Sequence, residues 1–233
     1  MGLALEVGIL ADLKSNDNEG YEYYRGQFEA INHALTAAGL PLHREPEGNP
    51  AGVWGCDLPR AALHCLRRIA AYEALAYGIP APSHDDGSRD PVVVDYYREI
   101  ETTPLVRLRR LIFGTSRGKL RFQHLMVHSD GEGYYLPVKF AEVIRSDPAL
   151  DIEGGRLGSS PVLLEECAEL ADLLDVPHDL APDSEDLWQA VEHPHNDQSA
   201  PRWLQYALES LACVCLMEAC RVSIANGAAI VFT

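Results

Sequence analysis

Three predicted helices in this chain end in the same way, with a helix-stopping residue followed two positions later by proline. These endings lie at residues 39–41 (GLP), 78–80 (GIP) and 175–177 (DVP). A residue such as glycine can close a helix in the left-handed conformation, and proline cannot continue one. The segments between the endings do not align with one another. The chain is therefore expected to pack several separate helices around a shared core.

Apolar residues at helical spacing predict where the other helix boundaries lie. The first helix covers about residues 21–38, and the second begins near Asp57, a favourable N-cap, with Pro59 in its first turn. The longest predicted helix covers residues 201–226 and ends before Gly227.

Short apolar runs predict a smaller amount of β-structure. Residues 3–13 and 228–232 are predicted strands near the two ends of the chain, and residues 119–137 are a predicted β-hairpin. We therefore expect an α+β fold: one mainly helical domain over residues 1–233, with a small antiparallel sheet formed by the hairpin and the terminal strands.

The hairpin prediction depends on the stretch FQHLMVHSDGEGYYLPVKF, residues 122–140. Its middle is rich in Asp and Gly, which favour tight turns, and apolar residues flank it on both sides. A strand would place His124 and His128 about 13 Å apart, too far to share one metal ion. Leu125 also stands where HExxH metalloenzymes have glutamate. The stretch therefore predicts a polar turn and no zinc site.

Two polar loops carry the candidate binding residues. In the hairpin turn, His128 and Asp130 could form an acid–base pair, or they could hydrogen-bond the turn backbone. In the glycine loop at residues 153–160, Arg156 could hold an anion at the start of the next helix, although Ser160 as N-cap explains that helix start without a ligand. The predicted binding residues are His128, Ser129, Asp130, Glu132, Tyr134, Tyr135, Arg156 and Ser159.

Other motifs give no complete catalytic or metal site. His193, His195 and Asp197 match part of a metallo-hydrolase motif, but Gln198 stands where a further histidine is needed. The six cysteines form no CxxC pair, so we expect buried, reduced thiols. Acidic neighbours of Cys167 would raise the pKa of its thiol, which disfavours a nucleophile. We expect no catalytic residue, metal ion or cofactor.

The chain is strongly acidic, with 35 Asp and Glu against 19 Lys and Arg, and a net charge of −16. Such a surface repels phosphate, so we expect a basic protein partner and no binding to nucleic acid or membranes. The basic run at residues 107–110 is predicted to be a solvated helix face.

The apolar residues 208–220 are too few to span a membrane, and the N-terminus has no signal peptide, so a cytoplasmic location is expected.

Three segments resemble a family of uncharacterised bacterial proteins. They are HSDGEGYYLPVKF (128–140), GGRLGSSPVLLEEC (154–167) and SLACVCLMEACRVSIANGAAIVF (210–232). The similarity extends to GLPLHREP (39–46), so it covers most of the chain. It implies a single bacterial domain, and it implies no activity, cofactor or functional residue.

Two functional hypotheses follow from these observations. The first is a non-enzymatic interaction protein of the immunity or inhibitor type, which binds a basic partner. The second is a small-molecule-binding enzyme, such as a hydrolase, with a pocket built from the turn at 128–135 and the loop at 153–160. The acidic charge and the lack of a complete catalytic motif favour the first hypothesis. Neither the partner nor the oligomeric state follows from the sequence.

Overall fold

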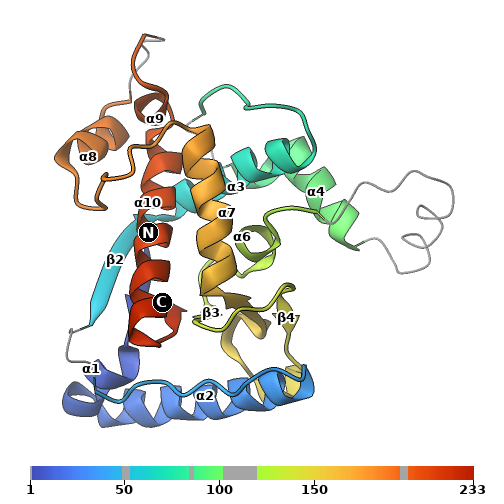
Figure 1. Cartoon of the computed structure of the whole chain (residues 1–233), viewed down its shortest axis with the longest axis vertical. Helices are drawn as coiled ribbons and strands as arrows, with labels where there is room; N and C mark the ends of the chain where they lie inside the picture. The colour runs from blue at the N-terminus through green and yellow to red at the C-terminus, as the bar shows by residue number, and fades with distance from the viewer. Residues whose placement is uncertain (1, 49–52, 84–86, 102–119, 195–198) are drawn as a thin grey trace, which may run out of the picture.

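The computed structural model describes residues 2–48, 53–83, 87–101, 120–194 and 199–233. Within these residues, six strands form one sheet in the order β2-β1-β6-β3-β5-β4 (Figure 1). The strands are β1 (Gly2–Val7), β2 (Trp54–Pro59), β3 (Gly133–Leu136), β4 (Ile144–Arg145), β5 (Arg156–Ser159) and β6 (Ile230–Phe232).

The sheet is mixed. β3 and β5 pair in parallel, and the other neighbouring strands pair antiparallel. The predicted α+β class and the two terminal strands are confirmed, because β1 pairs directly with β6. The prediction of a purely antiparallel sheet is wrong, because the chain between β3 and β5 crosses to the far side of β5 before it returns as β5.

Helices cover both faces of this sheet, and α7 and α10 run side by side through the centre of the molecule (Figure 1). Helix α2 lies across the end of the molecule opposite α8 and α9. The helices are α1 (Ile9–Asn16), α2 (Asn18–Ala37), α3 (Arg60–Ala74), α4 (Pro91–Glu101), α6 (Gln123–Val127), α7 (Ser160–Leu173), α8 (Glu185–Glu192), α9 (Arg202–Gln205) and α10 (Ala207–Asn226).

Alternation along the central strands separates two hydrophobic cores. In β3, Tyr134 and Leu136 face the core that includes Phe28 of α2. Tyr135, between them, faces the larger core under α3, α7 and α10. Successive side chains of a strand point to opposite faces, so a strand covered on both faces is apolar throughout. The uniform burial of β3 follows from its position between two helical layers.

The predicted hairpin at 119–137 is wrong, because residues 123–127 form the short helix α6. Phe122 starts it with a left-handed backbone, at φ 62°. Side chains satisfy its backbone: the Glu166 carboxylate accepts hydrogen bonds from the N–H groups of His124 and Leu125, at 3.1 and 2.8 Å. The Arg67 guanidinium donates to the carbonyl of Leu125, at 2.8 Å. Polar groups of other helices therefore replace the neighbouring strand that a hairpin would need.

The helix predicted at 201–226 is divided at Tyr206 into α9 and α10. Two strand boundaries also differ from the sequence prediction. The second helix begins at Arg60 and not at Asp57, because residues 54–59 extend the edge of the sheet as β2. The predicted strand at 3–13 stops at Val7, where Gly8 adopts φ 88° and α1 begins. Both changes lengthen or shorten a strand that pairs with a distant segment, which the local apolar pattern does not encode.

None of the described helices is long and apolar enough to cross a membrane. The six cysteines are unpaired thiols, and all except the half-buried Cys56 are buried. Burial of five of the six agrees with the sequence prediction, and Cys167, Cys213, Cys215 and Cys220 are part of the larger core. Burial also raises the pKa of Cys167, the direction that the sequence predicted.

Replacing Gly158 with alanine should destabilise the protein. A Cβ atom at this position of β5 would overlap the ring of Tyr135 in the adjacent strand β3. We expect Gly158→Ala to lower the free energy of unfolding by about 1–3 kcal/mol, measured by urea denaturation. The matched control is Gly26→Ala, on the exposed face of α2, where a Cβ atom meets nothing within 4 Å. The control should raise stability by about 0.5–1 kcal/mol. Equal effects of the two substitutions would contradict this packing.

Candidate functional site

The structure brings together the two loops that the sequence singled out. The turn after α6 and the loop before β5 line one cavity of about 660 Å³, together with the first turns of α3. Five of the eight predicted residues line this cavity: His128, Ser129, Asp130, Glu132 and Arg156. The pocket required by the second functional hypothesis is therefore present as a shape.

The other three predicted residues are buried and do not line the cavity. The Tyr134 hydroxyl donates to the Glu153 carboxylate, at 3.2 Å, and the Tyr135 hydroxyl donates to the carbonyl of His124, at 2.9 Å. Ser159 is the N-cap of α7, where Ser160 was predicted, and its hydroxyl accepts from a backbone N–H of the first turn. Their contacts in the structure hold β3, β5 and α7 in place.

His128 is enclosed by aromatic rings. Its imidazole stacks on Tyr135 with ring centroids 4.0 Å apart, and Phe232 lies 5.0 Å away. Its two ring nitrogens face the carbonyls of Ser129 and Tyr134, and a neutral ring can donate to only one of them. Burial, together with the positive charge of Arg67, lowers the pKa of His128 to about 3. The side chain is therefore neutral at physiological pH.

Asp130 is exposed and pairs with the buried guanidinium of Arg67. Arg67 also donates to the carbonyl of His128, at 2.9 Å, so it holds the whole turn against α3. The acid–base pair of His128 and Asp130, one of the two alternatives, is not formed. His128 bonds to the turn backbone, as the other alternative expected, whereas Asp130 pairs with Arg67 of α3 and not with the turn backbone.

Two predicted features lie wholly or partly outside the described residues. These are the basic run at 107–110 and most of the motif at 193–197. Among the residues that the structure describes, no three His, Cys, Asp or Glu side chains are grouped closely enough to hold a metal ion.

A second candidate surface comes from the distribution of charge along the chain. Residues 157–201 contain eleven Asp and Glu and no Lys or Arg, so this fifth of the sequence carries a large share of the net charge of −16. A count of charge in windows would have found this segment, whereas the total charge alone does not place it. The segment includes α7, the loop that follows it, and α8.

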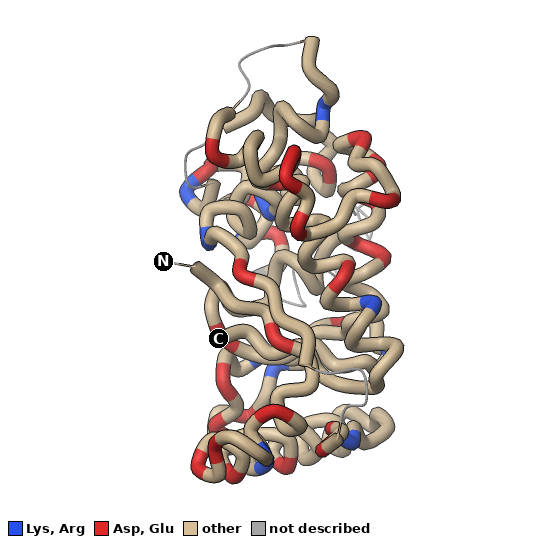
Figure 2. The backbone as a smooth tube through the Cα atoms, turned by 90° about the vertical axis from the view of Figure 1, so that its left-hand side faces the viewer, with Lys and Arg blue, Asp and Glu red and all other residues tan. Residues whose placement is uncertain are grey.

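Five carboxylates of α8 and the loop before it form no ion pair within the described part of the chain. We call Asp179, Asp183, Glu185, Asp186 and Glu192 the acidic α8 face; all five are exposed, and none forms a salt bridge to a described Lys or Arg. By contrast, Glu165 and Glu169 of α7 pair with Lys139 and Arg121. Figure 2 shows that Asp and Glu greatly outnumber Lys and Arg on the side of the molecule that carries α8. This surface is strongly electronegative.

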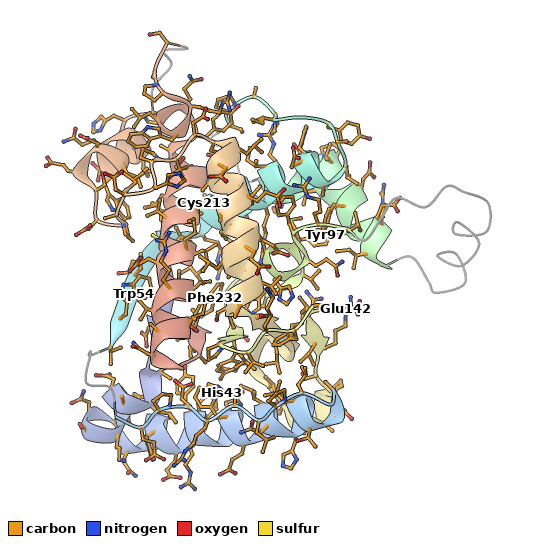
Figure 3. All side chains as sticks on the ribbon, in the orientation of Figure 1. His43, Trp54, Tyr97, Glu142, Cys213 and Phe232 are labelled. Carbon is orange, nitrogen blue, oxygen red and sulfur yellow. The ribbon has the colours of Figure 1, made fainter. Side chains whose placement is uncertain are left out.

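The acidic α8 face adjoins two cavities that contain all three tryptophans of the chain. The first, of about 840 Å³, is lined by Trp54, Trp188, Asp179 and Asp183, together with Asp57 of β2. Arg221 of α10 also lines it and pairs with Glu218, at 3.3 Å. Trp54 lies on β2 at the edge of the sheet (Figure 3). Burial raises the pKa of Glu6, on the strand paired with β2, and the charges of Asp12 and Asp57 act in the same direction.

The second cavity, of about 710 Å³, lies on the other side of α8 and contains the third tryptophan, Trp203. Asp186 and Glu192 line it as well. All three tryptophans are half-buried, with part of each ring accessible from the surface. Tryptophan beside carboxylates can hold a Lys or Arg side chain through ring and charge together, so this arrangement suits a basic partner.

Replacing His128 should change how stability depends on pH. The native pKa of about 3 lies below the unfolded value of about 6.5, so the unfolded state binds the extra proton between these values. The stabilising contribution is complete above pH 6.5 and is lost as the pH falls toward 3. Between pH 7 and pH 4 the wild type should lose about 3 kcal/mol more stability than His128→Phe, measured by urea denaturation. Parallel pH profiles of the two proteins would contradict a buried neutral His128.

Comparison with known proteins adds one finding. A family model described as "Putative DNA-mimic protein" matches residues 1–232, and no curated protein or solved structure matches the chain. The description relates these proteins to DNA, and the expected partners, a basic protein with nucleic acid excluded, are thereby corrected. The acidic surface repels phosphate, and it also resembles phosphate in the sign of its charge. The expectation considered only the repulsion. The description agrees with the predicted interaction role, and the chain belongs to the Putative DNA-mimic protein family.

Proposed function

We propose that this protein is an inhibitor that occupies the DNA-binding surface of a basic protein. The acidic α8 face takes the place of DNA phosphates there. The observation that carries the proposal is the set of five exposed carboxylates that no described cation neutralises. The family description supports it, and so does the net charge of −16.

Imitation of DNA requires negative charges at a spacing that a DNA-binding surface accepts. Residues three or four apart on a helix have Cβ atoms about 5–6 Å apart, and each DNA strand carries one phosphate charge per 3.4 Å of its axis. Glu185 and Glu192 lie seven positions apart, two turns along one side of α8. With Asp179 and Asp183 in the preceding loop, they form an extended charged surface and not a single point charge.

The tryptophan cavities add aromatic contacts to the charge of the acidic α8 face. A basic side chain that leaves water must be compensated, and an aromatic face beside a carboxylate compensates it in part. Trp188 is fixed in place because its indole N–H donates to the carbonyl of Pro182, at 2.8 Å. Rigid aromatic groups bind at a lower entropic cost than flexible ones. We infer that Lys or Arg side chains of the partner enter the cavity beside Trp54 and Trp188.

The negative field also favours fast association with a basic surface. Long-range attraction raises the rate of encounter and depends strongly on ionic strength. We infer that the protein acts in the cytoplasm, in the compartment that the sequence predicted, where DNA-binding proteins compete for DNA.

A binding experiment with charge-neutralised variants tests the proposal. The chain is immobilised, an extract of the cells that make it is applied, and proteins released by a 30-base-pair DNA duplex are identified. The dissociation constant of each released DNA-binding protein is then measured with Asp179→Asn, Asp183→Asn, Asp186→Asn and Glu192→Gln combined in one variant. We expect the variant to bind at least about tenfold more weakly, because four charge contacts are removed.

The matched control removes four charges elsewhere, at exposed acids of α1 and α2: Asp12→Asn, Glu19→Gln, Glu22→Gln and Glu29→Gln. It changes the net charge by the same amount and should retain nearly wild-type affinity. The proposal is wrong if DNA releases no DNA-binding protein. If the control variant loses affinity and the α8 variant does not, the acidic α8 face is not the binding surface.

Affinity should fall steeply as salt is added. Raising sodium chloride from 50 to 200 mM should weaken the complex by at least about tenfold, because ions screen exposed charge pairs. The fourfold variant of the acidic α8 face should show a shallower dependence, measured by titration at several salt concentrations. A complex with the same affinity throughout this range would show that apolar contacts, and not charge, hold the partner.

A further inference from the structure

A cationic cavity lies in this acidic protein, away from the acidic α8 face. It is the cavity of about 660 Å³ lined by the turn after α6, the loop before β5 and the start of α3. Three arginines line it: Arg60, Arg67 and Arg156. Against them stand two carboxylates, Asp130 and Glu132, so the ionised side chains of the described lining carry a net charge of +1 (three minus two). The sign of this charge is opposite to that of the whole chain.

Arg67 is already fully engaged. Its side chain is 3% exposed, and it pairs with Asp130. It also donates to the carbonyls of Leu125, His128 and Ser129. A buried guanidinium with this many partners is a structural group that holds the turn. The charge of Asp130 is likewise compensated by Arg67. Neither residue of this pair is therefore available to form an ion pair with a ligand.

Arg60 and Arg156 differ from Arg67 in this respect. Among the described residues, neither has a carboxylate partner, and the Arg156 side chain donates to the carbonyl of Val127. The Arg60 guanidinium lies over the backbone of Gly131, where an added Cβ atom would come within 2.7 Å of it. Two guanidinium groups with free donors thus face one cavity, and Glu132, the remaining acid in the lining, is exposed to solvent.

His64 adds a mostly buried imidazole to the lining. The residue is 8% exposed, and its side chain forms no hydrogen bond in the part of the chain that the structure describes. The ring can therefore bond to a molecule in the cavity without breaking an existing contact. An oxygen of a ligand in the cavity would accept the N–H of this imidazole.

The loop backbone is built around the cavity in a defined way. Gly154 adopts φ 70°, and a Cβ atom there would come within 2.6 Å of the Glu132 carbonyl oxygen. The two loops therefore touch through glycine, which fixes Arg156 relative to the turn.

Val93, Tyr97 and Met126 form an apolar part of the lining, and the Tyr97 hydroxyl is already bonded to the Met126 carbonyl, at 2.9 Å. Tyr97 lies on the side of the molecule opposite Trp54 (Figure 3).

We propose that this cavity binds a small organic anion, whose carboxylate or phosphate group contacts Arg60, Arg156 and His64 while its apolar part packs against Val93 and Tyr97. Guanidinium groups bind both kinds of anion through paired hydrogen bonds. The volume is in the range of small-molecule sites. The site is separate from the acidic α8 face, so it stands or falls independently of the proposed function.

Nuclear magnetic resonance of the histidine rings tests this site. The chain has nine histidines, and the His64 ring signals are identified by their absence from His64→Gln. The probes are inorganic phosphate and benzoate, each titrated to 20 mM against sodium chloride of equal ionic strength. We expect one or both probes to shift the His64 signals saturably, while sodium chloride does not. Saturation by phosphate alone identifies a phosphate site, and saturation by benzoate alone identifies a carboxylate site.

Arginine variants show whether the response comes from the proposed contacts. Arg60→Gln and Arg156→Gln should each weaken probe binding at least tenfold, whereas Arg25→Gln, on the exposed face of α2, should leave it unchanged. Arg60 is exposed and bears no ion pair, so its variant should keep the wild-type melting temperature and decides the test even if Arg156→Gln unfolds. The proposal is overturned if neither probe saturates, or if Arg60→Gln responds like Arg25→Gln.

Discussion

Hydrogen bonding by strand β6 joins the two halves of the sheet. β6 pairs with β1 on one side and with β3 on the other, so the β1–β2 pair and the β3–β5–β4 group meet only through three residues. Gly227, at φ 66°, closes α10 just before this strand, so the position of β6 also fixes α10. α10 in turn packs against α3, α7 and α8. The position of the acidic α8 face therefore depends on the pairing of β6 with β1 and β3, at the C-terminal end of α10.

The sequence predicted the elements that local chemistry determines. Glycine and proline predicted the helix ending at residues 39–41, and apolar spacing predicted the strand that ends at Phe232. The structure confirms both. The hairpin was wrong because long-range polar contacts override local preference: Glu166 and Arg67, both distant in sequence, bond the backbone of α6. Such contacts produce no periodic pattern in the sequence. The turn and the glycine loop were rightly grouped, but nothing local indicated that Arg60 and His64 would join them.

The arginines of the chain are used in a way that suits an electronegative surface. Several arginines make structural pairs, such as Arg67 with Asp130 and Arg68 with Asp90, at 2.8 Å for the second pair. Residues 157–201 contain none. An ion pair on the acidic α8 face would cancel the charge that a basic partner recognises. The cavity at Arg60 and Arg156 is also lined by Tyr97, which lies on the other side of the molecule from Trp54 (Figure 3). The arginine beside Trp54, Arg221, is paired with Glu218.

Hydrogen–deuterium exchange of the chain with and without a DNA-displaceable partner shows which surface the partner covers. If the acidic α8 face is bound, exchange slows in α8, in the loop at residues 174–184 and in β2, which together surround Trp54 and Trp188. Exchange in α2 and around the arginine cavity should not change. Protection confined to α2 or to the cavity, with α8 unaffected, would contradict the claim that the acidic α8 face is bound in place of DNA.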